Sequence, residues 1–270
     1  MSSAAIFIGG THFNIPSVSV HYPDTRNTGV PSGTSLTSSG SLTITTRGQV
    51  VANLSIASGS ITVNANDVII QNCYIAGATS TAVVYVTYGY GNCTIQNCTI
   101  NGIGTTNDGS NGIQSTGSII GCNIYNVENG INVSGADTTQ LITGNYIHGL
   151  LASGSPHYDG IQMDGGCKNI TISNNTIINP NPQTSCIMID NYFGSCNNIT
   201  VSNNVLSGAG YCIYSDASQA NSTTYPITNI TITNNHLGNG YYGDYTTNQN
   251  TPTYTGNVDD ANTVLATLSL

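Results

Sequence analysis

One short pattern recurs along most of this chain and limits what the chain can fold into. In each copy apolar and polar residues alternate before a turn at Asn, Cys or Gly. The copies are IIQNCYI (69–75), TIQNCTI (94–100), IIGCNI (119–124), LITGNYI (141–147), TISNNTI (171–177), TVSNNVL (200–206) and TITNNHL (231–237). When the copies are aligned on the residue two positions before their last one, that column reads Cys73, Cys98, Cys122, Asn145, Asn175, Asn204 and Asn235. Successive members are 25, 24, 23, 30, 29 and 31 residues apart. Repeats of roughly 20 to 50 residues are typical of solenoids.

The alternation within each copy indicates strands, because a half-buried strand has a period of two. Asn, Thr, Ser and Gly, which are frequent throughout the chain, disfavour a helix interior. A repeat of this length can circle once as short strands and stack on the next circle. We therefore predict an all-β fold, a parallel β-helix, in which equivalent residues of neighbouring coils lie ~4.8 Å apart.

The aligned column has a structural explanation. Side-chain amides stacked at this spacing hydrogen-bond along the axis, as Asn ladders do in cross-β stacks. Cys73, Cys98 and Cys122 stand in the same column. Cys167 and Cys196 each lie eight residues before their ladder Asn, and Cys186 and Cys212 each precede a strand Ile. Stacked cysteines would suit disulfide geometry and would equally pack as buried thiols, so both states stay open. No C-x-x-C pair or Cys/His cluster predicts zinc.

The repeat divides the chain into three parts. We assign residues 1–40 to an N-terminal cap or attachment segment, residues 41–237 to the β-helix and residues 238–270 to a C-terminal cap. Caps are expected because the open ends of a β-helix expose unpaired strand edges. The last residues, DDANTVLATLSL, predict either a short helix capped by Asp260 or a tail that binds a neighbour.

The composition excludes several classes of partner. Only 6% of residues are charged, the net charge is -9, and the cations are Arg26, Arg47 and Lys168. Nucleic acid and anionic membranes need many more cations, so we expect neither. No apolar run reaches the ~18 residues of a membrane span, so no membrane insertion is expected. A surface rich in amides and hydroxyls suits neutral, polyhydroxyl partners.

The compartment follows from the first residues and the cysteines. The start, MSSAAIFIGGTHF, lacks the basic segment of a secretion signal, whereas eight cysteines are unusual in a cytosolic protein. Two settings reconcile these features. Either a leader was removed from a secreted protein, or the protein is made in a cytosol and works outside, as a virion protein does.

A second pattern places three acids in one column. NGIQST (111–116), NGINVS (129–134), DGIQMD (159–164), SCIMID (185–190) and YCIYSD (211–216) align on an inward Ile. The residue three positions after that Ile should point outward. This position reads Thr116, Ser134, Asp164, Asp190 and Asp216, and the position one after the Ile carries Gln162, Met188 and Tyr214 in the last three copies.

The acidic column has three interpretations. It is a solvated strand end, a calcium or substrate site, or a catalytic site. As a metal site, Asp164, Asp190 and Asp216 would supply oxygen ligands to Ca²⁺. As a catalytic site, Asp164 with Asp190 would suit retaining glycoside hydrolysis, whose two carboxyls lie ~5 Å apart, and Asp164 with Asp216 would suit inversion with a water molecule between them. Calcium could also neutralise a uronate for β-elimination, with His157 as a candidate base, although His157 also fits a plain loop residue.

Polar and aromatic side chains around the column are candidate sugar contacts. Tyr is the expected stacking platform, because the chain has 16 Tyr and no Trp. The candidate substrate-binding residues are Tyr158, Asp159, Gln162, Lys168, Tyr192 and Tyr214.

The ladder segments and the DGIQ strand resemble the right-handed, pectate-lyase-like parallel β-helix superfamily over roughly residues 40 to 240. The lead-in PDTRNTGVPSGTSLTSSGSLTITT and the tail NHLGNGYYGDYTTNQNTPTYTGNVDD look like β-helix minor tail proteins of actinobacterial bacteriophages. Their H-x-D-G-I-Q strand is matched by His157, Asp159, Gly160, Ile161 and Gln162. The sequence departs from the enzymes of the superfamily, because no Arg stands near the acids and the N-T-D, D-D and G-H-G set of polygalacturonases is missing there.

The resemblance implies a right-handed β-helix in a virion tail, with other tail proteins as partners and, by analogy, a homotrimer. We expect a rigid rod that presents a glycan-contacting face to the host envelope, with cell-surface polysaccharide as its partner. The alternative is a secreted polysaccharide lyase or glycoside hydrolase, and a spacer without a ligand is the third reading.

Overall fold

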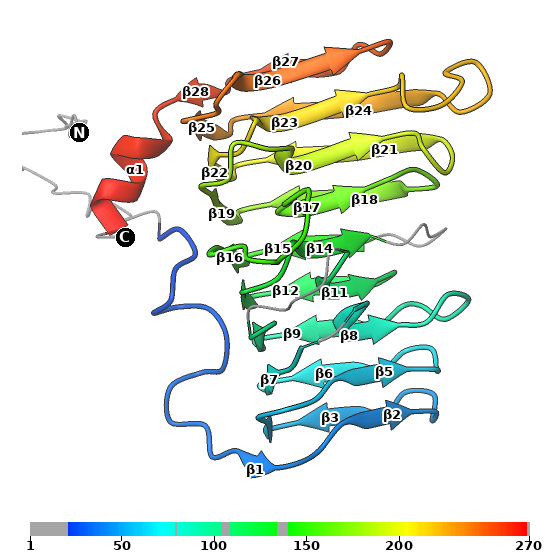
Figure 1. The fold of residues 1–270 in the computed structure, drawn as a ribbon, viewed down its shortest axis with the longest axis vertical. Helices are drawn as coiled ribbons and strands as arrows, with labels where there is room; N and C mark the ends of the chain where they lie inside the picture. Colours follow the sequence, from blue (N-terminus) through cyan, green and yellow to red (C-terminus); the bar gives the residue numbers. More distant parts are fainter. Residues whose placement is uncertain (1–20, 79, 104–108, 134–139, 269–270) are drawn as a thin grey trace, which may run out of the picture.

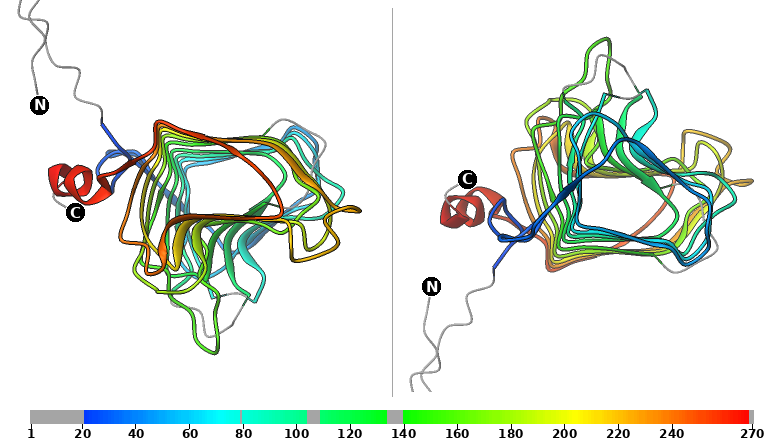
Figure 2. Two further views of the ribbon diagram at one scale, coloured as in Figure 1. Left: turned by 90° about the horizontal axis from the view of Figure 1, so that it is seen from above. Right: turned by 90° about the horizontal axis from the view of Figure 1, so that it is seen from below.

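The computed structural model describes residues 21–78, 80–103, 109–133 and 140–268 as a right-handed parallel β-helix with a terminal helix (Figure 1). Every strand pairing within it is parallel, and three sheets run along the axis (Figure 2). Ser134 of the predicted column and the first 20 residues of the predicted N-terminal segment lie outside the described residues. No helix in the described ranges has the length and apolar character needed to cross a membrane.

Sheet A contains the strands that carry the last residues of each ladder segment. Its strands, in spatial order, are β1 (Thr37–Ser38), β4 (Leu54–Ile56), β7 (Tyr74–Ala76), β10 (Thr99–Asn101), β13 (Asn123–Tyr125), β16 (Tyr146–Ile147), β19 (Thr176–Asn179), β22 (Val205–Gly208), β25 (His236–Gly238) and β28 (Val258–Asp259). Each coil therefore adds one short strand to this sheet.

Sheet B contains the second sequence pattern. Its strands are β2 (Leu42–Ile44), β5 (Ile61–Val63), β8 (Ala82–Val86), β11 (Asn111–Ser115), β14 (Asn129–Val133), β17 (Ile161–Met163), β20 (Ser185–Asp190), β23 (Tyr211–Asp216) and β26 (Gly243–Asn248). The predicted alignment on Ile is confirmed from Ile113 through Ile131, Ile161 and Ile187 to Ile213.

Sheet C contains the first half of each ladder segment. Its strands are β3 (Val50–Ala52), β6 (Ile69–Gln71), β9 (Thr94–Gln96), β12 (Ser118–Ile120), β15 (Gln140–Thr143), β18 (Lys168–Ser173), β21 (Cys196–Ser202), β24 (Ile227–Thr233) and β27 (Thr253–Thr255). The three sheets continue past residue 237, the end of the β-helix in the sequence-based division, because β26, β27 and β28 complete one further coil.

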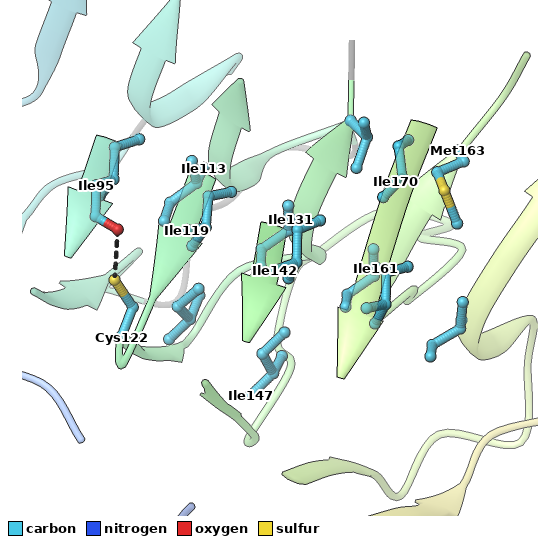
Figure 3. Close-up of a cluster of buried hydrophobic side chains, with 14 of the residues drawn as sticks. Ile95, Ile113, Ile119, Cys122, Ile131, Ile142, Ile147, Ile161, Met163 and Ile170 are labelled. Carbon is cyan, nitrogen blue, oxygen red and sulfur yellow. Dashed lines mark hydrogen bonds between the residues drawn. The ribbon is translucent and has the colours of Figure 1, made fainter. Parts of the chain in front are cut away.

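The interior is a set of stacked apolar columns contributed by all three sheets. Figure 3 shows part of it, where Ile side chains from successive coils lie one above another. Ile95, Ile119, Ile131 and Ile161 are each no more than 1% exposed. Burying such a side chain contributes ~1.5–3 kcal/mol, so each coil is held by its neighbours rather than by its own strands.

The predicted Asn ladder is present and fully bonded. Nδ2 of Asn145 donates to Oδ1 of Asn175 at 2.9 Å, and the same bond joins Asn175 to Asn204 and Asn204 to Asn235. Each Nδ2 also donates to a carbonyl of the preceding coil. The ladder ends at Asn257, whose Oδ1 accepts from Asn235 at 2.8 Å.

The cysteines continue this arrangement as free thiols. All eight are buried and unpaired by disulfides. In the first coils a thiol takes the place of the Asn amide, and Sγ of Cys122 donates to the carbonyl of Ile95 (Figure 3). Of the two states that the sequence left open, the structure has the buried thiol.

Residues 21–36 and helix α1 (Ala261–Leu268), which are far apart in the sequence, both lie beside sheet A (Figure 1). Residues 21–36, here called the N-terminal strap, run along this sheet toward β1, and the amide of Gly29 donates to Gly121 O at 2.8 Å. Helix α1 packs against β22 and β25, so the helical alternative for the last residues is the one observed. The carbonyl of Asp260 accepts from Thr263 N and Val264 N, while its carboxylate turns to His236.

Candidate functional site

The three acids of the predicted column are brought together at one edge of sheet B. Asp190 pairs in register with Asp216, and the pairing of Met163 with Ile189 places Asp164 beside Asp190. The carboxylates therefore follow one another at the ends of β17, β20 and β23, with ~4.8 Å between adjacent strands. The register of inward Ile residues was enough to predict this placement.

Burial changes the protonation of these acids. Asp190 is 9% exposed, and burial raises its pKa to about 7, with further upward contributions from the charges of Asp164 and Asp216. The pKa of Asp164 is also raised by burial, against the lowering effect of a hydrogen bond with Gln162. With a pKa of about 7, Asp190 therefore exchanges its proton close to neutral pH.

The predicted calcium site does not fit this geometry. Among the described residues, no group of three or more His, Cys, Asp or Glu side chains is placed to hold a metal ion. Each carboxylate is occupied locally instead. Oδ1 of Asp190 accepts from Tyr192 N at 2.9 Å, and Asp216 accepts from Ser218 N at 2.8 Å and from Gln219 Nε2 at 2.9 Å. The acids share a column but do not converge on a common point.

Asp159 lies in a second ladder at the corner between sheets A and B. Nδ2 of Asn129 donates to Asn111, the amide of Asp159 donates to Oδ1 of Asn129 at 3.0 Å, and Oδ1 of Asp159 accepts from the amide and hydroxyl of Ser185. Asp159 is 1% exposed, and burial raises its pKa to about 8. Its predicted contact with substrate conflicts with this burial, which leaves the carboxyl a structural role.

A pocket of about 470 Å³ opens on the same face of sheet B. It is lined by Gly109, Asn111, Glu128, Asn129, Asn132, His157 and Gln162. The lining consists almost entirely of amide and acid side chains, and it includes two of the predicted site residues. Such a wall offers both donors and acceptors to a ligand.

Glu128 organises this pocket and was not among the predicted residues. It is 3% exposed, and its carboxylate accepts hydrogen bonds from the backbone amides of Gly109 and His157. Two chain segments that precede β11 and β17 are thereby held on one acid. One sequence signal could have identified Glu128, namely its place in the repeat. It stands directly before the NGI triplet of its coil, as Tyr158 stands directly before DGI.

Gln162 connects the pocket to the acidic column. Its Oε1 accepts from Nδ2 of Asn132 at 3.0 Å, and its side chain hydrogen-bonds to Asp164. His157 precedes β17 and Asp164 follows it, so the structure places the two at opposite ends of that strand. The predicted general base therefore belongs to the pocket, away from the column.

The other predicted contacts are distributed around the face. The Tyr158 hydroxyl donates to Ala152 O at 2.9 Å and ties its own loop together. Lys168 begins β18 in sheet C, around the corner from the column. Tyr192 is 58% exposed and lies edge-on to Phe193, a residue the sequence did not single out, whose amide donates to Asp164 O at 2.7 Å.

Tyr214 points outward from β23 and lies edge-on to Tyr211, with 5.1 Å between ring centroids. It occupies the same column as Gln162 and Met188. Aromatic side chains therefore stand beside the acids on this face.

Comparison with known proteins gives little that bears on this site. No family model matches the sequence, and no curated protein matches it. Among solved structures, a match described as "Crystal structure of Agl-KA catalytic domain" has a TM-score of 0.47 and 17% identity. It covers 80% of this chain and 47% of that one, so the chain spans about half the length of the matched protein.

Proposed function

We propose that this protein binds a polysaccharide on the outer face of sheet B. The observation that carries the proposal is the pocket of about 470 Å³ whose walls are Asn, Gln, Glu and His side chains. Amides donate and accept hydrogen bonds at once, which matches the hydroxyl groups of a sugar. The side chains are also held in place, since Asn132 bonds Gln162 and Glu128 fixes the loop amides.

The test compares two outward glutamines, each of which hydrogen-bonds to an amide side chain of a neighbouring coil. Gln162→Leu alters the pocket, whereas Gln96→Leu removes an outward glutamine of sheet C that bonds Gln71 at 2.8 Å. Binding of a panel of neutral and acidic polysaccharides is measured by affinity electrophoresis and calorimetry. Loss of binding in Gln162→Leu alone supports the proposal. Equal behaviour of the two variants, or no binding by the unmodified protein, contradicts it.

A second candidate is hydrolysis of the bound glycan, favoured by a raised pKa of about 7 at Asp190 beside Asp164. Protonated Asp190 would donate its proton to the glycosidic oxygen while carboxylate Asp164 bonds the anomeric carbon and the leaving sugar departs. Water would then attack that carbon, give its proton to Asp190 and release Asp164. Neighbouring strands lie ~4.8 Å apart, a spacing compatible with the ~5 Å carboxyl separation that a retaining reaction uses.

Reducing-end release distinguishes cleavage from binding. Asp190→Asn and Asp164→Asn are each expected to abolish the release and to leave binding in place. Asp259→Asn is the matched control, because this exposed acid lies on β28 in sheet A. If the unmodified protein releases no reducing ends from any glycan that it binds, it is a binding protein without hydrolase activity.

We further propose that the binding operates at the tail of a bacteriophage, outside the host cell. The support is the resemblance of residues 23–46 and 235–260 to β-helix minor tail proteins. Proteomics of purified virions should recover the chain with other tail proteins, and light scattering should give the mass of a trimer. Recovery only from the secreted fraction of virion-free cultures would favour the secreted alternative.

A further inference from the structure

Four tyrosines form a cluster at the end of sheet B opposite β2. Tyr211 lies 5.1 Å from Tyr214 and 5.9 Å from Tyr242, and Tyr242 lies 4.8 Å from Tyr241, all measured between ring centroids. Two of the contacts are edge-on and one is tilted, so the rings present faces in different directions. We call these four residues the tyrosine cluster.

The outer half of the cluster is open to solvent and yet held in place. Tyr241 is 69% exposed and Tyr242 is 63% exposed. Their backbone amides donate to Ala209 O at 2.9 Å and to Gly210 O at 2.8 Å. These large aromatic side chains stay mostly exposed although hydrogen bonds fix their backbone. Such an exposed group of aromatic side chains marks an interaction surface.

Two members of the cluster stand in the same side-chain columns as the pocket. Tyr211 pairs with Ser185 and continues the corner column of Asn129, whereas Tyr214 pairs with Met188 and continues the column of Asn132 and Gln162. In the strand order β14, β17, β20, β23, the pocket strands β14 and β17 lie three and two steps from β23. Steps of ~4.8 Å give ~10–14 Å, roughly the length of a short oligosaccharide.

The face between the pocket and the cluster repels anions. Asp164, Asp190 and Asp216 border it, and no Lys or Arg lies on β14, β17, β20 or β23. Arg26 and Arg47 are paired with Asp24 and Asp67, outside this face. A polyanionic glycan laid across these strands would gain no countercharge.

We propose that the tyrosine cluster is a second sugar subsite, which binds the ring faces of an uncharged glycan whose other end occupies the pocket. This proposal rests on the proposed binding function and deepens it. One chain of sugars engages both subsites, so short oligosaccharides bind each subsite weakly. A chain that spans both gains from the effective concentration that the linkage provides.

The experiment is a length series of uncharged oligosaccharides from a polymer that the protein binds, titrated by calorimetry. Affinity should rise steeply once the oligosaccharide spans the two subsites. Tyr242→Ala should weaken the long ligand by roughly ten-fold, as expected for one lost stacking contact, and leave the binding of short ligands at the pocket unchanged. Tyr242→Phe keeps the ring and should bind as the unmodified protein does.

Tyr88→Ala is the matched control, because Tyr88 is 83% exposed and follows β8, far along the sheet from the cluster. Normal binding of the long ligand by Tyr242→Ala, or tighter binding of a uronate polymer than of its neutral counterpart, would overturn the second subsite or its preference for uncharged sugars. Either result would leave the pocket function standing if Gln162→Leu still loses binding. Loss of binding in Tyr88→Ala to the same degree would also overturn it.

Discussion

The hydroxyl of Tyr22 lies 2.8 Å from Nε2 of His236, although 214 residues separate them in the sequence. On the other side of the imidazole, Nδ1 of His236 lies 2.6 Å from Oδ1 of Asp260. Three side chains therefore join the N-terminal strap, strand β25 and the start of α1. The strap is thus bonded to the last coils before it reaches the first strand, which couples the two ends of the stack.

Tyr22→Phe is expected to loosen this connection without disturbing the ring contact with His236, whose centroid lies 5.5 Å away. The loss of one partly buried hydrogen bond should cost about 1 kcal/mol of the free energy of unfolding. Hydrogen exchange should accelerate at the strap amides, Gly29 among them. Tyr88→Phe, at an exposed ring, is the control, and unchanged strap exchange in Tyr22→Phe would contradict the coupling.

The Asn ladder gives a graded prediction at Asn175. Its Nδ2 donates to Ile142 O and Asn204 Oδ1, and its Oδ1 accepts from the amide and the side chain of Asn145. Asn175→Ala leaves these buried partners unpaired and should destabilise the fold by about 3 kcal/mol or more. Asn175→Cys should cost less, because Cys98 and Cys122 occupy the same column and donate to the equivalent carbonyls.

Chemical denaturation measures both Asn175 variants, with Asn203→Gly as a control at an exposed corner where φ is 56°. Gly adopts that backbone readily, so the control should be nearly neutral. An Asn175→Cys variant that is no more stable than Asn175→Ala would show that the thiol does not replace the amide.

The sequence predicted the features that repeat. A ladder residue recurs at every coil, and the inward Ile fixes the register of sheet B, so the neighbourhood of Asp164 and Asp190 followed from counting alone. The same pattern also accounts for Asp159, which lies two residues before the inward Ile161 and is therefore on the inner side, 1% exposed. Its assignment to the substrate contacts disregarded this alternation. Gly160, between the two, is tightly packed, since a Cβ there would lie 2.5 Å from Ile177.

The pocket could not be derived in the same way. Glu128 bonds backbone amides at Gly109 and His157, and a backbone amide leaves no mark in the sequence. The loops that meet there also differ in length from coil to coil. Of the tyrosine cluster, only Tyr214 was among the predicted contacts. Tyr211 and Tyr214 follow the repeat, whereas Tyr241 and Tyr242 come from a connection after β25.

Gln140 offers a route to a more stable protein. It pairs with Ile170 and points into the core at 1% exposure. Neither its Oε1 nor its Nε2 has a hydrogen-bond partner among the described residues. Gln140→Leu should raise the free energy of unfolding by roughly 1–3 kcal/mol, because an unpaired buried amide is removed.

Thermal and denaturant unfolding would measure the gain, and Thr171→Val on the outward side of β18 is the control. A loss of stability in Gln140→Leu would mean that the amide is bonded in solution, for instance by a buried water molecule.

The buried acid Asp159 makes stability depend on pH. Burial raises its pKa to about 8, above the ~3.9 of an unfolded Asp. Between these values the folded chain keeps a proton that the unfolded chain has released. The contribution of Asp159 to the free energy of unfolding is therefore fully present below about pH 4 and is lost progressively as the pH rises toward 8. Asp190, with a pKa of about 7, acts in the same direction over a narrower range.

Asp159→Asn should flatten this dependence and raise stability at pH 8.5 relative to the unmodified protein. The amide suits the column, because Asn111 and Asn129 already occupy it and Oδ1 can still accept from Ser185. Denaturation midpoints at pH 5 and pH 8.5 test the prediction, with Asp259→Asn at the surface as the control. Parallel pH profiles for the unmodified protein and Asp159→Asn would show that the carboxyl ionises freely in the folded state. In the double variant Asp159→Asn, Asp190→Asn, most of the pH dependence of stability that remains in Asp159→Asn should disappear.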